Sequence, residues 1–369
     1  MAWWFWASRA CVAGLAAGLF PPQQRDWNLP AAVPLSPKAY GRLTREAIVQ
    51  PFAKAAQALN EDWGSVYDGR QVQRWTQKAG EELLTQQALE QQAYEQGWHP
   101  PGPKNDPPLL VIGMDGGRVQ NRQKNGPDGS RWREDKVLTL SSFQPGDGQD
   151  QPPQRRVTTY LATMRDSAGF GVLARLEAER RGIRQARQVL VLAEGGAWID
   201  TLHQRHFLRH IRIIDWYHAV EHLHEVAQAL YPQQEQRGKK LAAKLETLLW
   251  QGRVAGVLRI LRAAGGKLGP PLADDGAEHP RRVLAQNVGY FERHAPHMNY
   301  PEYRRRGWPI GSGITEGGVK QFNKRVKGTE QFWNDSGVEP ILALRALWLS
   351  EDDRWDHYWL GPSSLRPAA

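Results

Sequence analysis

The sequence predicts an α/β protein in which a mixed sheet follows a helical region and is interrupted by a long helical insertion. Three observations predict this class. Short apolar runs typical of buried strands begin at Leu109 and recur up to Ile214. Residues 36–95 carry helical patterns with few β-branched runs. About 80 residues of mostly helical pattern separate the last strand from a basic helix near the C-terminus.

Composition points to a polyanionic partner. The chain has 369 residues, a formal net charge of +9 and a pI of about 9.6. This length can hold two or three domains, and the basic balance favours nucleic acid or a membrane surface as a partner. The single cysteine, Cys11, excludes a disulfide framework and a cysteine-rich zinc site. These features are consistent with a reducing cytoplasm.

Residues 1–35 form an irregular or truncated N-terminal segment. Aromatic residues come first, Arg9 interrupts the apolar run, and no clear cleavage site follows, so the pattern is not that of a signal peptide. The longest uncharged run is broken by Pro21 and Pro22 and is short for a membrane span. We therefore expect no membrane role.

Residues 36–98 are expected to form a helical DNA-binding domain. An apolar stripe ends at Leu59, Trp63-Gly64 marks a turn, and a second helix follows, as in a helix-turn-helix. The second helix would present Arg70, Gln71 and Arg74 to phosphates and base edges. A plain helical hairpin with a polar face is the alternative. Residues 99–108 contain five prolines and form a linker.

Five strands are expected after the linker, at 109–114, 133–143, 157–164, 188–193 and 211–214, with helices at 167–182 and 198–208. An acid follows three of these strands. Asp115, with two glycines beside it, ends the first strand, and Glu194 and Asp215 end the last two. A carboxylate at the end of a central strand can face a ligand, although Asp215 could instead cap a helix and Glu194 could be a turn residue.

A strong helix begins at Trp216, and residues 219–306 read as a helical insertion. The core then comprises residues 109–218 and 307–335, and residues 336–369 form a C-terminal helix and tail.

Residues 307–327 carry the most informative pattern. A Gly-Ser-Gly turn leads into a helix whose first turn holds one acid, Glu316. The other charges on this helix are basic, and we expect these side chains to contact DNA phosphates: Lys320, Lys324, Arg325 and Lys327. An acid at the start of a lysine-rich helix suits metal-dependent phosphoryl transfer on DNA. The alternative is a solvated helix with a Glu-to-Lys pair.

The chain resembles the RNase H-like DDE transposases, and more specifically bacterial insertion-sequence transposases of the Kra-type group, which are related to the Mutator-like enzymes. The resemblance covers residues 36–360. Its motifs are IGMDGG at 112–117, DWYHAVEHL at 215–223, GWPIGSGITEG at 307–317, Arg325-Val326-Lys327 with Trp333, and LALRALWLSEDDRWDHYW at 342–359.

The resemblance implies cleavage of transposon ends and strand transfer into target DNA, with two Mg²⁺ ions held by carboxylates and Mn²⁺ as a possible substitute. Asp115 is the first acid and Glu316 the last. The second is Glu194 or Asp215, and His218 assists beside the site. The implied partners are double-stranded DNA and further copies of the chain, in the bacterial cytoplasm at the nucleoid.

Two departures from the family pattern bear on activity. Glu194-Gly195-Gly196 stands where the family has Asp-Gly-Ala, and the paired N-terminal cysteines are missing. A catalytically impaired remnant that only binds DNA is therefore the main alternative. A second alternative is a zinc peptidase, because His218, Glu221 and His222 form an H-x-x-E-H pattern.

Overall fold

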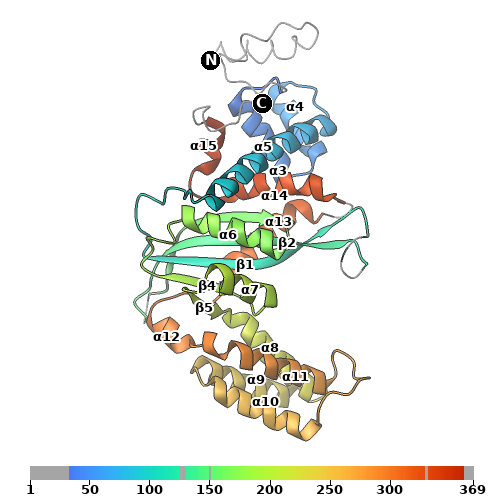
Figure 1. The fold of residues 1–369 in the computed structure, drawn as a ribbon. Coiled ribbons are helices and arrows are strands. Elements are labelled where there is room, and N and C mark those ends of the chain that lie inside the picture. The colour runs from blue at the N-terminus through green and yellow to red at the C-terminus, as the bar shows by residue number, and fades with distance from the viewer. Residues whose placement is uncertain (1–32, 125, 127–128, 149–150, 329–330, 361–369) are drawn as a thin grey trace.

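The computed structural model describes residues 33–124, 126, 129–148, 151–328 and 331–360. The elements lie in three regions along an elongated molecule (Figure 1). Helices from the two ends of the chain pack together at one end. The sheet occupies the middle, and a bundle of helices from the centre of the sequence lies at the other end.

A five-stranded mixed sheet forms the centre. Its strands are β1 Leu109–Gln120, β2 Trp132–Gln144, β3 Gln154–Thr163, β4 Val189–Ala193 and β5 Ile211–Ile214. Their order in the sheet is β3-β2-β1-β4-β5. The first three strands are antiparallel, whereas β4 pairs in parallel with both β1 and β5. This is an RNase H-like arrangement, and the predicted fold class is confirmed.

Strand β1 is longer than the sequence predicts. We expected it to end at Asp115, but it continues to Gln120 and pairs with β2 along its whole length. The glycines do not end the strand because they make room for acids of β2. A Cβ at Gly116 would lie 2.6 Å from Oε1 of Glu134, and a Cβ at Gly117 would lie 2.5 Å from Oδ1 of Asp135. Asp115 therefore lies inside a strand, opposite Val137.

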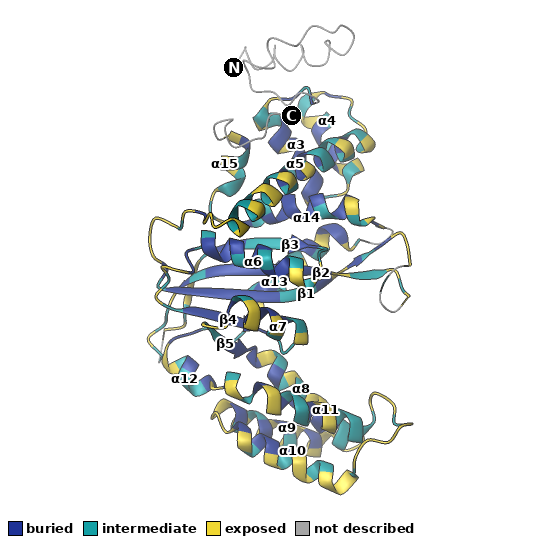
Figure 2. Ribbon diagram, viewed as in Figure 1, coloured by how far each residue is buried: buried dark blue, intermediate teal, exposed yellow. Residues whose placement is uncertain are grey.

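Helices cover both faces of the sheet. Side chains alternate between the two faces along β1. Leu110, Ile112 and Met114 pack against residues of α6 (Ser167–Arg180) and α7 (Ala197–His206). Helix α13 (Gly313–Val326) packs on β1 and β2. The strands between these helices are largely buried (Figure 2).

The N-terminal helices are α3 Pro37–Val49, α4 Phe52–Trp63 and α5 Gly69–Glu95. They share one hydrophobic core with α14 (Asp335–Leu349) and with Trp359 of α15 (Arg354–Leu360). Gly80 allows close packing, since a Cβ there would lie 2.7 Å from Cα of Pro340. The expected turn is present, with Gly64 in the left-handed conformation after α4. The second helix is long, at 27 residues, and carries its buried side chains onto this core.

The helical insertion lies between β5 and α13. It comprises α8 Trp216–Leu230, α9 Glu235–Trp250, α10 Val254–Leu268, α11 Pro280–His294, η2 Ala295–His297 and α12 Tyr300–Arg305. Its core is continuous with the sheet, because Leu109 and Val111 belong to the same buried cluster as Leu223, Leu245 and Phe291. The edge-to-face contact between Trp216 and Tyr300, 4.9 Å between ring centroids, joins the two ends of the insertion.

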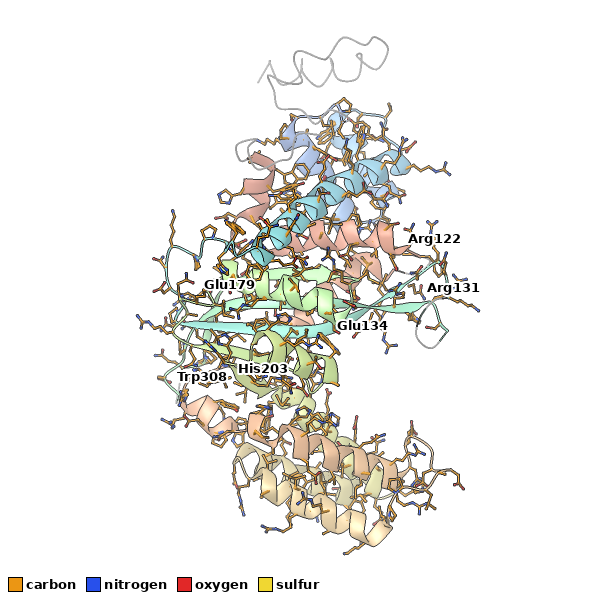
Figure 3. The ribbon with its side chains drawn as sticks, viewed as in Figure 1. Arg122, Arg131, Glu134, Glu179, His203 and Trp308 are labelled. Carbon is orange, nitrogen blue, oxygen red and sulfur yellow. The ribbon has the colours of Figure 1, made fainter. Side chains whose placement is uncertain are left out.

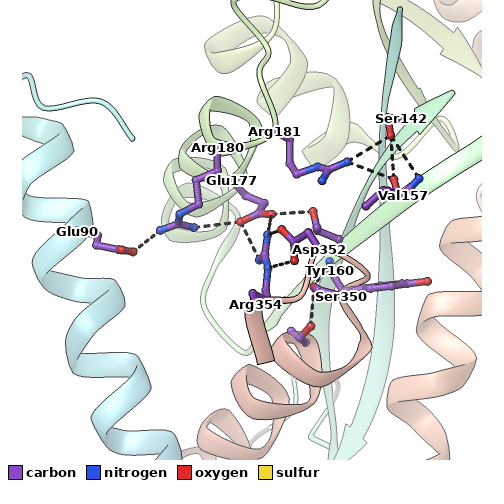
Figure 4. A network of polar contacts seen from close by, with 12 residues as sticks. Glu90, Ser142, Val157, Tyr160, Glu177, Arg180, Arg181, Ser350, Asp352 and Arg354 are labelled. Atoms are coloured by element: carbon purple, nitrogen blue, oxygen red, sulfur yellow. Dashed lines mark hydrogen bonds and ion pairs between the residues drawn. The ribbon is translucent and has the colours of Figure 1, made fainter. Parts of the chain in front are cut away.

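A buried ion-pair network ties the N- and C-terminal helices to the sheet (Figure 4). Glu177 of α6 accepts hydrogen bonds from Thr159 and Arg354 and pairs with Arg180, which also pairs with Glu90 of α5. Burial alone would raise the pKa of Glu177, but Arg354 and Arg180 lower it to about 2. The carboxylate is therefore ionised, as a buried acid can be when it is paired.

Several expectations fall on residues outside this description. Residues 1–32, with Cys11 among them, and the tail from residue 361 onward lie outside the described residues. In the part of the chain that the structure describes, no helix is both long and apolar enough to cross a membrane.

Candidate active site

The close approach of helix α13 to strand β1 builds the centre of the candidate site. Gly113 makes this approach possible, because a Cβ there would clash with Oγ1 of Thr315 and would lie 2.6 Å from Oγ1 of Thr139. The two threonine hydroxyls are hydrogen-bonded at 2.8 Å. Asp115 lies two residues after Gly113 and so on the same face of the sheet. Glu316 follows Thr315 directly, and the contact therefore brings both acids to one face.

The Gly-Ser-Gly turn before α13 is fastened to the start of α8. The backbone N–H of Ser312 donates to Oδ2 of Asp215, and the N–H of Trp216 donates to the carbonyl of Ile310 at 2.9 Å. Gly311 fits against Tyr217, since a Cβ there would lie 2.7 Å from the ring. The Ser312 hydroxyl donates to Oε1 of Glu316 at 3.3 Å. These contacts fix where α13 begins and orient its acid.

Glu194 reaches the same region from the end of β4. Val191 of β4 lies opposite Ile112 of β1 in a parallel pair, so the chain leaves β4 beside the Asp115 end of β1. The buried guanidinium of Arg212 holds this strand end. It donates to the carbonyls of Ala193 and Ile213, each at 3.1 Å, and to the carbonyl of Glu194.

Electrostatics show that the predicted acids influence one another. Burial, together with the nearby carboxylates of Glu194 and Glu316, raises the pKa of Asp115 to about 6. The hydrogen bond from the N–H of Gly116, at 2.7 Å, and the nearby His218 oppose this rise. The structure thus brings together four of the predicted site residues: Asp115, Glu194, Glu316 and His218.

Asp215, the other candidate for the second acid, caps helix α8. Its Oδ1 accepts the N–H of His218 at 2.8 Å, its Oδ2 accepts the N–H of Ser312, and the residue is fully buried. Both oxygens are therefore engaged by backbone donors. The carboxylate stabilises the start of a helix, as capping acids do.

Sequence reasoning missed a further acid beside the site. Asp135 is fully buried opposite Gly117, and its carboxylate oxygens have no hydrogen-bond partner among the described residues. Burial, together with the charges of Glu134 and Asp115, raises its pKa to about 6. The sequence holds a signal for this acid, because Asp135, Val137 and Thr139 occupy every second position of a predicted strand and so lie on the same face of the sheet.

The carboxylates of Asp115, Glu194 and Glu316 are of the chemical type that binds a divalent cation. Carboxylate oxygens are the ligands that Mg²⁺ prefers. A cation would also offset the repulsion between Asp115 and the carboxylates of Glu194 and Glu316, which adds to the effect of burial on the pKa of Asp115. As the side chains stand, no three His, Cys, Asp or Glu residues within the described ranges lie close enough to hold one ion. Binding would require the carboxylates to move together.

The predicted DNA-binding residues divide into two groups. Arg70 and Arg74 are exposed and Gln71 is half-buried on the first turns of α5. Lys320, Lys324 and Lys327 are exposed on α13. The structure therefore leaves most of these side chains accessible to a ligand.

The prediction for Arg325 is wrong. This residue is 2% exposed, its Nε donates to the carbonyl of Ala47 at 2.8 Å, and its guanidinium lies over the rings of Phe52 and Trp333. Arg325 therefore joins α13 to α3 and cannot reach a phosphate from this position.

The H-x-x-E-H pattern does not assemble a zinc site in the described part of the chain. Nδ1 of His218 lies 3.3 Å from Glu221, and Nδ1 of His222 lies 3.4 Å from Glu225. His222 also packs on Tyr290, with ring centroids 3.9 Å apart. No third ligand joins the histidines among the described residues.

Comparison with known proteins gives a distant structural neighbour. No family model matches the chain, and no curated protein matches it. A chain from the strand transfer complex of the Drosophila P element transposase is similar in structure, with 10% sequence identity and a TM-score of 0.36. The similarity covers 92% of this chain and 97% of the other. The chemistry of the candidate site rests on its own residues.

Proposed function

We propose that this protein is a DNA transposase of the DDE type, within the Kra-type insertion-sequence group, and that Asp115, Glu194 and Glu316 are its catalytic carboxylates. One observation carries the proposal. The Gly113–Thr315 contact sets Glu316 beside Asp115 on an RNase H-like sheet, and Glu194 is the third acid that acts on Asp115. Converging carboxylates next to a basic helix suit phosphoryl transfer on a polyanion.

Asp115, Glu194 and Glu316 would hold two Mg²⁺ ions, with Mn²⁺ as a substitute. When bound, the ions activate the attacking water or 3′-hydroxyl and stabilise the leaving oxygen. His218 favours the ionised form of Asp115, because its nearby charge lowers the pKa of that acid. Lys320, exposed one turn after Glu316, would bind a phosphate of the DNA strand and align it with the acids.

Glu194 is the better candidate for the second acid, because the carboxylate of Asp215 is already hydrogen-bonded to the backbone. Asp215 is buried and already accepts two backbone hydrogen bonds. Glu194 is half-buried, and its charge raises the pKa of Asp115. Using Asp215 as a ligand would uncap α8 and release the turn before α13, which costs about 1 kcal/mol or more.

A cleavage and strand-transfer assay tests the proposal. The substrate is a duplex that carries the sequences flanking the gene, with Mg²⁺ or Mn²⁺ added. We expect cleavage and joining by the native chain and loss of both steps in Glu316→Gln, with DNA binding retained. Binding without cleavage by the native chain would support a DNA-binding remnant and contradict the catalytic proposal.

The proposal includes assembly on DNA, since cutting and joining two ends calls for two active sites. We expect light scattering of the protein with a flanking duplex to give a complex of at least two chains. A complex that contains a single chain would contradict this part of the proposal.

A further inference from the structure

The paired ends of β1 and β2 extend beyond the rest of the sheet. Strand β3 pairs with β2 only from Lys136 onward, and β4 pairs with β1 only at Leu110, Val111 and Ile112. From Arg118 to Gln120 the two strands therefore continue as a two-stranded ribbon, which projects from the molecule (Figure 1). We call residues 118–124 and 129–133 the hairpin arm.

The hairpin arm is strongly basic. Arg118, Arg122, Lys124 and Arg131 are all exposed. Figure 3 shows Arg122 and Arg131 at the projecting end of the ribbon. The nearby described carboxylates already have partners, because Glu134 pairs with Lys136 and Asp335 pairs with Arg133. The described residues of the arm therefore carry a net positive charge.

Aromatic rings and backbone carbonyls hold these cations in place. The guanidinium of Arg131 lies 5.4 Å from the centroid of Phe332, a ring that is 41% exposed, and also donates to the carbonyl of Arg122. Nε of Arg122 donates to the carbonyl of Phe332 at 3.3 Å. Nζ of Lys327 lies 5.3 Å from the ring of Trp132. Such contacts reduce the freedom that a cation loses on binding a phosphate.

The segment after α13 fixes the base of the hairpin arm. The N–H of Trp333 donates to the carbonyl of Gln120 at 2.9 Å, and the N–H of Arg122 donates to the carbonyl of Trp333 at 2.7 Å. Asn121 donates to Asp335 at 2.8 Å. Trp333 in turn donates from its ring N–H to the carbonyl of Val326 at 2.9 Å, which connects the arm to the end of the helix that carries Glu316.

Helix α13 connects the hairpin arm to the candidate active site. Thr315, in the first turn of the helix, lies over Gly113, and Lys327, directly after its last residue, lies over Trp132, which is opposite Gln120. At 1.5 Å per residue these positions are about 18 Å apart, which corresponds to roughly five base pairs of duplex DNA. Lys320 and Lys324 are exposed between them.

We propose that the hairpin arm, together with Lys324 and Lys327, binds the phosphate backbone of double-stranded DNA roughly five base pairs from the cleaved phosphate. This inference rests on the proposed function, since that function places DNA at Glu316. The contacts are from guanidinium and ammonium groups to phosphate, so they position the duplex without reading its sequence.

The test measures DNA binding without metal, as a function of salt. The probe is a 30-base-pair duplex in EDTA, and the full chain is compared with the double variant Arg122→Ala/Arg131→Ala. Each phosphate contact contributes about 0.9 to the slope of log K against log salt. We expect the slope to fall by about 2 and the affinity to fall at least tenfold at 0.1 M salt.

Two further variants serve as controls. Lys244→Ala/Arg259→Ala removes two exposed cations from α9 and α10 at the far end of the molecule, and we expect no change in slope. Arg122→Lys/Arg131→Lys keeps the charges, and we expect it to restore most of the slope. A hydroxyl-radical footprint should lose protection about five base pairs from the cut only in the alanine variant.

An unchanged slope in the alanine variant, or tighter binding of single-stranded RNA than of the duplex, would overturn the inference. The proposed function has a separate readout, because Glu316→Gln should abolish cleavage while leaving the salt slope intact. If cleavage persists in Glu316→Gln but the arm variant loses its slope, the catalytic proposal fails and the binding surface remains.

Discussion

The three glycines of β1 each lie where another side chain occupies the space of a Cβ. Thr315 fills the space at Gly113, Glu134 at Gly116 and Asp135 at Gly117. Because none of the three needs a left-handed backbone, their role here is close packing rather than conformational freedom. At the scale of single residues, the candidate site therefore depends on the small size of these three glycines as much as on its acids.

The first prediction concerns Gly113. In Gly113→Ala the new methyl group clashes with Thr315, so α13 must move away from β1 and take Glu316 with it. We expect a loss of about 1–3 kcal/mol in the free energy of unfolding, measured by urea denaturation, together with loss of cleavage. Thr315→Ala in the same chain should recover part of the stability. A Gly113→Ala protein as stable as the native one would contradict this view of the contact.

The second prediction concerns Asp135 and pH. Its pKa in the folded protein is about 6, above the ordinary value of 3.8, so the folded state holds the proton more tightly than the unfolded state. The contribution of Asp135 to stability is then greatest below about pH 4 and falls as the pH rises toward 6. A shift of this size costs on the order of 3 kcal/mol above pH 6.

Asp135→Asn removes this cost. We expect its free energy of unfolding, relative to the native protein, to rise between pH 4 and 6 and to stay higher at pH 7. Glu134→Gln, on the opposite and solvent-facing side of the same strand, should change the pH dependence far less. Identical pH profiles of stability for the native protein and Asp135→Asn would contradict a raised pKa of Asp135 in the folded protein.

At the scale of elements, the ends of β4 and β5 are held by one buried guanidinium. Arg212 donates to the carbonyls at 193, 194 and 213, and its only carboxylate partner among the described residues is Asp200, at 3.6 Å. We infer that Arg212 positions the second acid.

The third prediction tests this positioning role. Arg212→Met should lower the rate of DNA cleavage by about ten- to a hundredfold, because a displacement near 1 Å is enough for such a loss. In a Glu194→Gln background the same change should add little, since the group that Arg212 positions is already disabled. Equal losses in both backgrounds, measured by single-turnover cleavage, would show that Arg212 acts only on folding.

Elements with strong periodicity could be predicted from the sequence. The apolar runs gave β2 to β5 within a few residues, and the stripe after Trp216 gave α8. The end of β1 could not be predicted, because Gly116-Gly117 looks like a chain break until the acids of β2 are placed against it. The length of α5 depends on packing against α14, far along the chain.

At the scale of the whole molecule, contacts between distant segments decide which predicted site residues come together. Ser312 donates to the second carboxylate oxygen of the capping residue Asp215, which lies 97 positions earlier. Arg325 is buried because it meets Ala47, 278 positions earlier. Neither contact leaves a periodic signal. The motifs predict Asp115 and Glu316 as site acids and keep both Glu194 and Asp215 as candidates for the second acid, whereas the two backbone hydrogen bonds that engage Asp215 are visible only in the fold.

Helices from the N- and C-terminal parts of the chain are also linked to the helix that carries Glu316. Helix α13 carries Glu316 at its start, and Arg325 near its end donates to the last turn of α3. Arg345 of α14 donates to the carbonyls of Gln321 and Ile48 and so holds the same junction. The N-terminal helices therefore share a support with the helix that carries Glu316.

Binding of Mn²⁺ to the full chain, followed by electron paramagnetic resonance, tests the central claim most directly. If Asp115, Glu194 and Glu316 form a metal-binding carboxylate set, then Asp115→Asn, Glu194→Gln and Glu316→Gln should each weaken Mn²⁺ binding on the order of tenfold or more. Asp215→Asn should lower stability and leave the affinity unchanged. Affinity that is unaffected by Glu316→Gln, or that is lost only in Asp215→Asn, would contradict the account.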